Sequence, residues 1–133
     1  MPHLIVEYSA NLDPQIDIDA LLVELHAAAA ASGVFPLGGI RTRAARREHY
    51  RIADGHPDNA FVHVVARIRH GRPLDVRQRA GTLLFETLCK SLEVVYATRP
   101  LGISLEVQEI DPDVSYKQNN LHEYVAERER SRP

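Results

Sequence analysis

The sequence opens with Met1-Pro2-His3-Leu4-Ile5-Val6-Glu7-Tyr8, the stretch around which the rest of the chain is arranged. Leu4, Ile5 and Val6 form an apolar run rich in β-branched residues, which predicts a buried β-strand. Proline is tolerated at the first position of a strand, where its missing N–H group is not needed for the ladder. The plain interpretation of Pro2 is therefore that it opens an edge strand.

A second interpretation gives Pro2 a chemical role. Removal of the initiator methionine, which is usual before a small residue such as proline, leaves a secondary amine at the N-terminus. A terminal amino group has a reference pKa of about 7.7 to 8.0, and burial or a nearby cation lowers that pKa. Pro2 is thus a candidate base for proton transfer near neutral pH.

Length, charge and cysteine content restrict the class of protein. A chain of 133 residues is long enough for one domain with a single core. The net charge of −2 does not provide the basic field that binds nucleic acid. Cys89 is the single cysteine, no signal segment is evident, and no apolar run is long enough for a membrane helix. We therefore expect a soluble, cytoplasmic protein with no nucleic-acid or membrane partner.

The first half of the chain reads as strand, helix, strand. Asp17 or Asp19 can cap a helix over about residues 18–32, in which apolar residues recur at helical spacing. Residues 40–52 read as a long polar strand or a pair of strands. The turn-forming residues 53–59 then predict a hairpin to the next strand.

The second half repeats this order. Residues 60–68 give the clearest strand pattern in the sequence, with four β-branched residues among them. Asp75 and Gln78 resemble a capping box at the start of a helix that extends to about Ala97. Residues 101–108 alternate apolar and polar side chains, which predicts a half-buried strand.

The repeated order predicts an α+β fold built from two βαβ units. Each unit is expected to place its two strands parallel, so that two units side by side form a four-stranded mixed sheet with both helices on one face. The other face then needs a cover, and a second copy of the sheet provides one, so we expect a closed homo-oligomer. We assign residues 1–124 to the domain and expect the charged residues 125–133 to be a disordered tail.

Five ordered blocks of the sequence resemble a known family. A Met-Pro strand before a duplicated βαβ fold is the pattern of the tautomerase superfamily, and the blocks narrow the resemblance to the 5-carboxymethyl-2-hydroxymuconate isomerase family. The segment 43–51 departs from that family, because it is unusually basic and lacks the expected aromatic residues. The resembling blocks are Pro2–Glu7, Gly33–Arg41, Ala53–Gly55, Ala60–His63 and Lys117–His122.

The resemblance implies a fold, an assembly and a reaction. It implies a homotrimer that isomerises an unsaturated 2-hydroxy polycarboxylate to its 2-oxo isomer in homoprotocatechuate degradation, without a metal or organic cofactor. By matching position, it implies that Pro2 is the catalytic base and that Arg41 and Arg72 bind carboxylates of the substrate. Arginine suits this role because its fork of donors binds a carboxylate bidentately and stabilises a dienolate. His3, which follows the base, is a further candidate substrate contact.

Two other functions remain open at this point. One is a non-catalytic trimeric binding protein that keeps the tautomerase scaffold, and a retained Met1 would favour it. The other is a tautomerase of another 2-hydroxydienoate or of a phenylpyruvate-like acid. We predict no metal site, because four histidines at seven-residue intervals fall in strands and turns, where that spacing does not align side chains. These histidines are His49, His56, His63 and His70.

Overall fold

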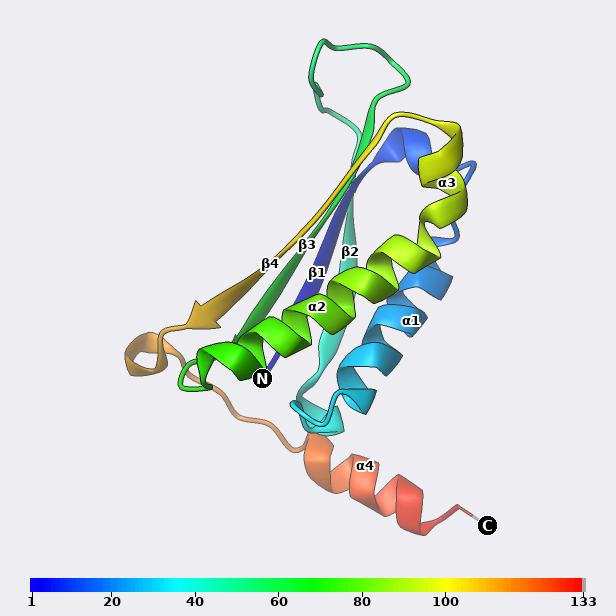
Figure 1. Ribbon diagram of the computed structural model, residues 1–133. Helices are drawn as coiled ribbons and strands as arrows, with labels where there is room; N and C mark the ends of the chain where they lie inside the picture. Colours follow the sequence, from blue (N-terminus) through cyan, green and yellow to red (C-terminus); the bar gives the residue numbers. More distant parts are fainter. Residues whose placement is uncertain (133) are drawn as a thin grey trace.

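The computed structural model describes residues 1–132 and is organised around one four-stranded sheet (Figure 1). The strand order is β2-β1-β3-β4, with β1 parallel to β2, antiparallel to β3, and β3 parallel to β4. This confirms the predicted mixed sheet of two βαβ units. The strands are β1 (His3–Ser9), β2 (Arg41–Arg47), β3 (Ala60–Arg69) and β4 (Leu101–Ile110).

Two long helices lie side by side on one face of the sheet, as the sequence predicted (Figure 1). They are α1 (Ile18–Ala31) and α2 (Leu74–Ser91). The carboxylate of Asp17 caps α1 by accepting a hydrogen bond from the Ala20 N–H at 3.1 Å. The shorter elements are α3 (Glu93–Thr98), α4 (Leu121–Arg130) and the 3₁₀ turns η1 (Ala10–Leu12), η2 (Leu37–Gly39) and η3 (Pro112–Val114).

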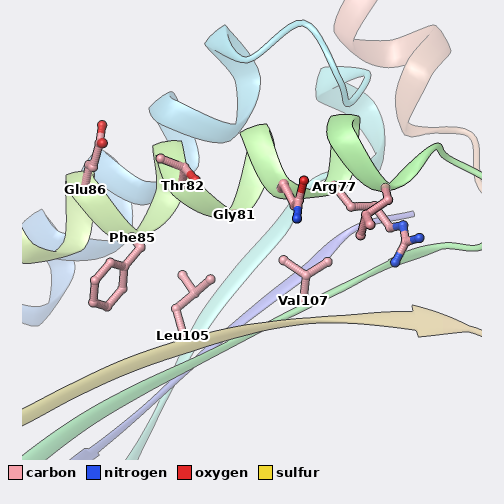
Figure 2. Close-up of a pocket in the computed structure, with 9 residues that line it drawn as sticks. Arg77, Gly81, Thr82, Phe85, Glu86, Leu105 and Val107 are labelled. Carbon is pink, nitrogen blue, oxygen red and sulfur yellow. The ribbon is translucent and has the colours of Figure 1, made fainter.

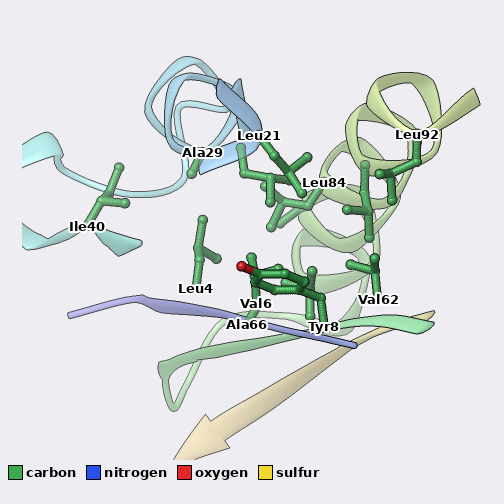
Figure 3. Packing of buried hydrophobic residues seen from close by; sticks show 14 of the residues in the cluster. Leu4, Val6, Tyr8, Leu21, Ala29, Ile40, Val62, Ala66, Leu84 and Leu92 are labelled. Atoms are coloured by element: carbon green, nitrogen blue, oxygen red, sulfur yellow. The ribbon is translucent and has the colours of Figure 1, made fainter. Parts of the chain in front are cut away.

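The core lies between the sheet and these two helices (Figure 3). Alternate residues of β1 and β3 point toward the helices, because side chains of a strand alternate between its faces. The helices contribute apolar residues at spacings of three and four. The fully buried or nearly buried side chains at this contact include Leu4, Val6, Val62, Val64, Leu21, Leu25, Leu84 and Leu88.

The second helix differs from its predicted form at both ends. The N-cap of α2 is Pro73, and no side chain caps the helix, so the predicted capping box of Asp75 and Gln78 is wrong. Pro73 instead fixes the backbone before the first helical turn. The helix also does not continue to Ala97, because Leu92 leaves helical geometry at φ −105° and ψ 7° and separates α2 from α3.

The predicted hairpin across residues 53–59 is wrong. β2 and β3 are not neighbours, because β1 lies between them in the sheet. β2 also ends at Arg47, so the connection of residues 48–59 projects beyond the sheet as a loop (Figure 1). The turn residues do form local turns, and the side-chain amide of Asn59 donates to the Ile52 carbonyl at 3.1 Å. Turn propensity therefore located the bend correctly but did not determine which strands pair.

The expected disordered tail is also corrected. Helix α4 continues from within the assigned domain through residues 125–130, and it packs against η2. The Arg128 guanidinium lies 5.8 Å from the centroid of the Tyr124 ring, one helical turn earlier. Pro133 lies outside the described residues. Among residues 1–132, no helix is long and apolar enough to cross a membrane; the cytoplasmic location remains a prediction.

Candidate active site

Pro2 lies immediately before β1, at the end of the sheet where β2 also begins and β3 and β4 end (Figure 1). Pro2 is buried, and its carbonyl accepts a hydrogen bond from the backbone N–H of Arg41 at 3.0 Å. This bond continues the parallel ladder, in which His3 is paired with Arg41. The register between β1 and β2 therefore brings two of the predicted site residues together.

The guanidinium groups of Arg41 and Arg72 are both held by backbone carbonyl oxygens. Arg41 donates to the Gly39 carbonyl at 2.9 Å. Arg72 donates to the carbonyls of Val34 and Arg69, each at 3.2 Å, and its guanidinium lies 5.0 Å from the centroid of the Phe35 ring. Neutral carbonyl acceptors hold an arginine in place without cancelling its charge, so both groups remain able to bind an anion.

The electrostatic environment of the chain terminus favours a neutral amine. The pKa of the Met1 amine is lowered first by burial and then by the positive charges of Lys117, Arg72, Arg41 and Arg69. Removal of Met1 moves the terminal nitrogen by one residue, about 3.8 Å along the chain. The Pro2 amine therefore lies in the same cationic surroundings, and each cation disfavours its protonated form.

His3 faces the open side of the sheet rather than the helices. Its ring Nδ1 lies 3.1 Å from Nη1 of Arg43. A guanidinium can only donate, so Nδ1 accepts and the ring hydrogen is on Nε2. Burial and then the charges of Arg43 and Arg41 lower the pKa of His3, so the ring is neutral at pH 7.

Two glycines allow the N-terminus and helix α4 to approach each other. A methyl group at Gly38 would lie 2.6 Å from Nδ1 of His122 and 2.8 Å from its backbone nitrogen, closer than any side chain permits. A methyl group at Gly39 would lie 3.5 Å from Cδ of Pro2 and 3.8 Å from Cε1 of His122. Asn119 fixes the same contact, since its amide donates to the Gly38 carbonyl at 3.3 Å. Pro2 and His122 therefore both lie against Gly39.

A small cavity adjoins the N-terminus. It has a volume of about 150 Å³ and brings together the end of β3 and the segment between β4 and α4. Cationic and hydroxyl side chains and an apolar wall line it. Its lining residues are Met1, Arg69, Ile110, Pro112, Ser115 and Lys117.

A separate groove of about 490 Å³ lies between α2 and the edge strand β4, and Figure 2 shows Phe85, Leu105 and Val107 facing it. None of the residues predicted for the site lines this groove. The groove is therefore distinct from the end of the sheet that carries Pro2.

Comparisons with known proteins show the family of the chain. The family model of 5-carboxymethyl-2-hydroxymuconate isomerase matches residues 2–125. The chain belongs to the 5-carboxymethyl-2-hydroxymuconate isomerase family. It is thus an isomerase, as the sequence predicted. A 5-carboxymethyl-2-hydroxymuconate Delta-isomerase from Escherichia coli is 40% identical to it over 122 residues, which cover 92% of this chain and 97% of the relative.

Two solved structures resemble this isomerase over nearly the whole chain. A 5-carboxymethyl-2-hydroxymuconate isomerase from Deinococcus radiodurans R1 is 38% identical with a TM-score of 0.86, and 93% of each chain is covered. A 5-carboxymethyl-2-hydroxymuconate delta-isomerase is 30% identical with a TM-score of 0.88, covering 94% of this chain and 93% of the other. The fold class predicted from the two βαβ units is thereby confirmed.

Sequence reasoning missed part of the surroundings of Pro2 in this isomerase. Lys117 and His122 bound a block that resembles the family, but no role was inferred for either of them. Asn119 lies in the same block, and its side-chain amide donates to the Gly38 carbonyl. The adjacent glycines 38 and 39 were the signal in the sequence, because a glycine pair before a strand often marks a close approach of another segment.

Proposed function

We propose that this isomerase converts 5-carboxymethyl-2-hydroxymuconate to its 2-oxo isomer, with the mature Pro2 amine as the group that moves the proton. The observation that carries the proposal is the buried Pro2 at a chain terminus whose amine pKa is lowered by burial and by nearby cations, among them Arg41 and Arg72. The guanidinium groups of these two arginines are held by backbone carbonyls. The family membership and the names of the relatives support the choice of substrate.

The reaction needs one base and no change in oxidation state. The neutral amine accepts the proton of the 2-hydroxyl group, and the C2–O bond becomes a carbonyl as the double-bond electrons shift along the diene. The resulting ammonium returns a proton to the carbon at the far end of the conjugated system. A single amine with a lowered pKa serves both steps, because it is neutral before the first and protonated before the second.

Arg41 and Arg72 act as carboxylate-binding residues in this proposal. Each carries a fork of N–H donors, and their charges stabilise the negative charge that develops on the dienolate. His3 is the third substrate contact, with its neutral ring offering the Nε2 hydrogen as a donor.

We further propose that three copies assemble through the open face of the sheet. In the part of the chain that the structure describes, no helix covers this face (Figure 1). It carries half-buried apolar side chains of β1 and β3, namely Ile5, Phe61 and Val65. Association of apolar sheet faces removes this surface from water. Light scattering is expected to give three times the 14.9 kDa monomer mass.

The test combines intact mass with turnover. The purified protein is expected to lack Met1 and to change the ultraviolet absorbance of 5-carboxymethyl-2-hydroxymuconate well above the uncatalysed rate. The processed protein could fail to convert this acid and still convert another 2-hydroxydienoate or phenylpyruvate. That result would overturn the proposed substrate and keep the proposed type of reaction. No conversion of any of these acids would overturn the enzyme function and favour a binding role.

A further inference from the structure

The cavity beside the N-terminus is not used by the mechanism above. Its polar wall is formed by Arg69 at the end of β3 and by Ser115 and Lys117 before α4, while Ile110 and Pro112 form an apolar wall. Met1 also lines it, so the cavity begins within one residue of the Pro2 nitrogen. A group bound there therefore lies at the same end of the sheet as Pro2, against the residue that precedes it.

The two cations of this cavity carry uncompensated charge. Within residues 1–132, neither Arg69 nor Lys117 forms a salt bridge, whereas the nearby Arg77 is paired with Glu109 at 3.5 Å. Glu109 also accepts from the Gly71 N–H, and the carboxylate of Asp111 accepts from the Asp113 N–H inside its own turn. The carboxylates of Glu109 and Asp111 are therefore engaged elsewhere. Two unpaired cations beside a concavity favour an anion there.

The charge of Lys117 acts on the chain terminus. Among the charged groups, Lys117 lowers the pKa of the terminal amine most, ahead of Arg72 and Arg41. Arg69 is linked to the same region, because its carbonyl accepts a hydrogen bond from Arg72 at 3.2 Å. The cavity therefore lies at the same end of the sheet as Pro2, and both of its cations lower the pKa of the terminal amine.

The substrate of the proposed reaction requires a third anion site. 5-Carboxymethyl-2-hydroxymuconate carries the two terminal carboxylates of a muconate and a third on its carboxymethyl arm. Arg41 and Arg72 account for two of the three. With Met1 in place the cavity has a volume of about 150 Å³, below the roughly 300 Å³ at which complete ligand pockets begin. It therefore has room for one arm beside the reacting centre rather than for the whole molecule.

We propose that Lys117 and Arg69 bind the carboxylate of the carboxymethyl arm and thereby select the tricarboxylate over substrates that lack the arm. The inference rests on the proposed function. The Ser115 hydroxyl supplies an additional donor, and Ile110 and Pro112 pack against the methylene carbon. Removal of Met1 joins the cavity to the Pro2 amine, so the same processing step frees the base and opens the arm site.

The experiment compares two enols and two variants. Lys117→Gln and Arg69→Gln are assayed with 5-carboxymethyl-2-hydroxymuconate and with 2-hydroxymuconate, which lacks the arm. Assays are run at a pH high enough for the amine to be neutral, since loss of the Lys117 charge also raises the pKa of the amine. Lys90→Gln is the matched control, because Lys90 is the other lysine and lies exposed at the end of α2.

We expect each site variant to lower the kcat/KM ratio of the tricarboxylate to the dicarboxylate by about tenfold, the size of one lost charge-assisted hydrogen bond. Most of the change is expected in KM, and Lys90→Gln is expected to keep the parental ratio. A site variant that keeps the parental ratio, whether it loses activity equally on both substrates or on neither, would overturn the arm site.

Binding separates this inference from the proposed function. Titration calorimetry compares the affinities for 2-carboxymethylmuconate and for muconate. Neither acid has an enol hydroxyl or can turn over, so the difference in affinity is the contribution of the arm alone. We expect the processed parent to bind the arm-bearing acid about tenfold more tightly and Lys117→Gln to lose this preference. A parent without that preference overturns the arm site even if it turns over the enol. A parent with the preference but no turnover keeps the arm site and overturns the reaction.

Discussion

The two βαβ units have the same topology, yet only one of them begins with a chain terminus. The first unit starts at Pro2, whose carbonyl bonds to the start of β2. The second starts at Asn59 and Ala60, and the Ala60 N–H bonds to the Pro100 carbonyl before β4 at 3.1 Å. Each bond joins the starts of the two parallel strands of its unit, although donor and acceptor are exchanged between the units, and Ala60 lies within the chain and has no free amine.

The two units also differ in the contacts of a nearby arginine, which is Arg72 for the first unit and Arg99 for the second. Arg72 is held by two carbonyls and keeps its charge available beside the N-terminus. Arg99, near the start of β4, donates to the carbonyls of Asn11 and Asp58 and to the side chain of Gln15. It ties loops together at the opposite end of the sheet. The comparison teaches that two units of the same topology can differ in role. In the proposed function the first unit carries the reacting amine, whereas the start of the second is held by hydrogen bonds between loops at the other end of the sheet.

The largest effect is expected from the residues that open the two units. Pro2→Ala is expected to lower kcat by about 10²-fold or more, because it replaces the rigid secondary amine that is the proposed base. Asn59→Ala is the matched change in the second unit. It removes hydrogen bonds to Ile52 and Asp54 and is expected to lower the melting temperature without comparable loss of kcat. Similar kcat losses in both variants would contradict the distinction between the units.

The arginines give the next effect. Arg72→Ala is expected to lower kcat/KM by about 10- to 100-fold through loss of a charged carboxylate contact. Arg99→Ala is expected instead to reduce the free energy of unfolding by about 1–3 kcal/mol, because three acceptors lose their donor. Steady-state kinetics and urea unfolding of both variants measure the two quantities. Arg72→Ala with unchanged kinetics would remove Arg72 from the site.

A glycine substitution tests whether α4 supports the site end of the molecule. Gly38→Ala is expected to cost about 1–3 kcal/mol by overpacking, because the added methyl group meets the backbone of His122. Displacement of α4 is expected to expose it to proteolysis. Gly102→Ala serves as the control, since a methyl group there meets no atom of this chain within 4 Å. Equal stability of Gly38→Ala and the parent would show that α4 is not held by this contact.

The smallest effect concerns pH. The folded terminal amine has a lowered pKa, so the unfolded chain binds more protons in the window between the two pKa values. Stability is therefore expected to rise slightly with pH up to the unfolded pKa of about 8. In the same way, kcat/KM is expected to rise as the Pro2 amine loses its proton and then to level off.

Neutralising a nearby cation sharpens this pH test. Lys117→Gln removes a positive charge that lowers the amine pKa, so the rising limb of the kcat/KM profile is expected to move to higher pH. A limb that moves to lower pH, or does not move in this variant and in Arg72→Ala, would argue against the terminal amine as the base.

Local patterns in the sequence were enough for most of the elements. The apolar run before Glu7, the helical spacing after Asp17 and the alternation after Pro100 each predicted an element that the structure contains. Among the predictions that failed, one concerned a distant strand partner and one a local helix cap. The turn after Ile52 was placed correctly, but its strands pair with others, and the capping residues near Asp75 do not cap α2.

By itself, the sequence determined the two βαβ units, the family resemblance and the candidate role of Pro2, because these depend on residue type and on spacing within a few positions. Only the tertiary structure decided that β1 lies between β2 and β3, and that α4 is ordered against the glycine pair. Asn119 and Gly38 are 81 residues apart, and Lys117 meets the N-terminus from the far end of the chain. Such contacts follow from strand order and register, which no short stretch of the sequence contains.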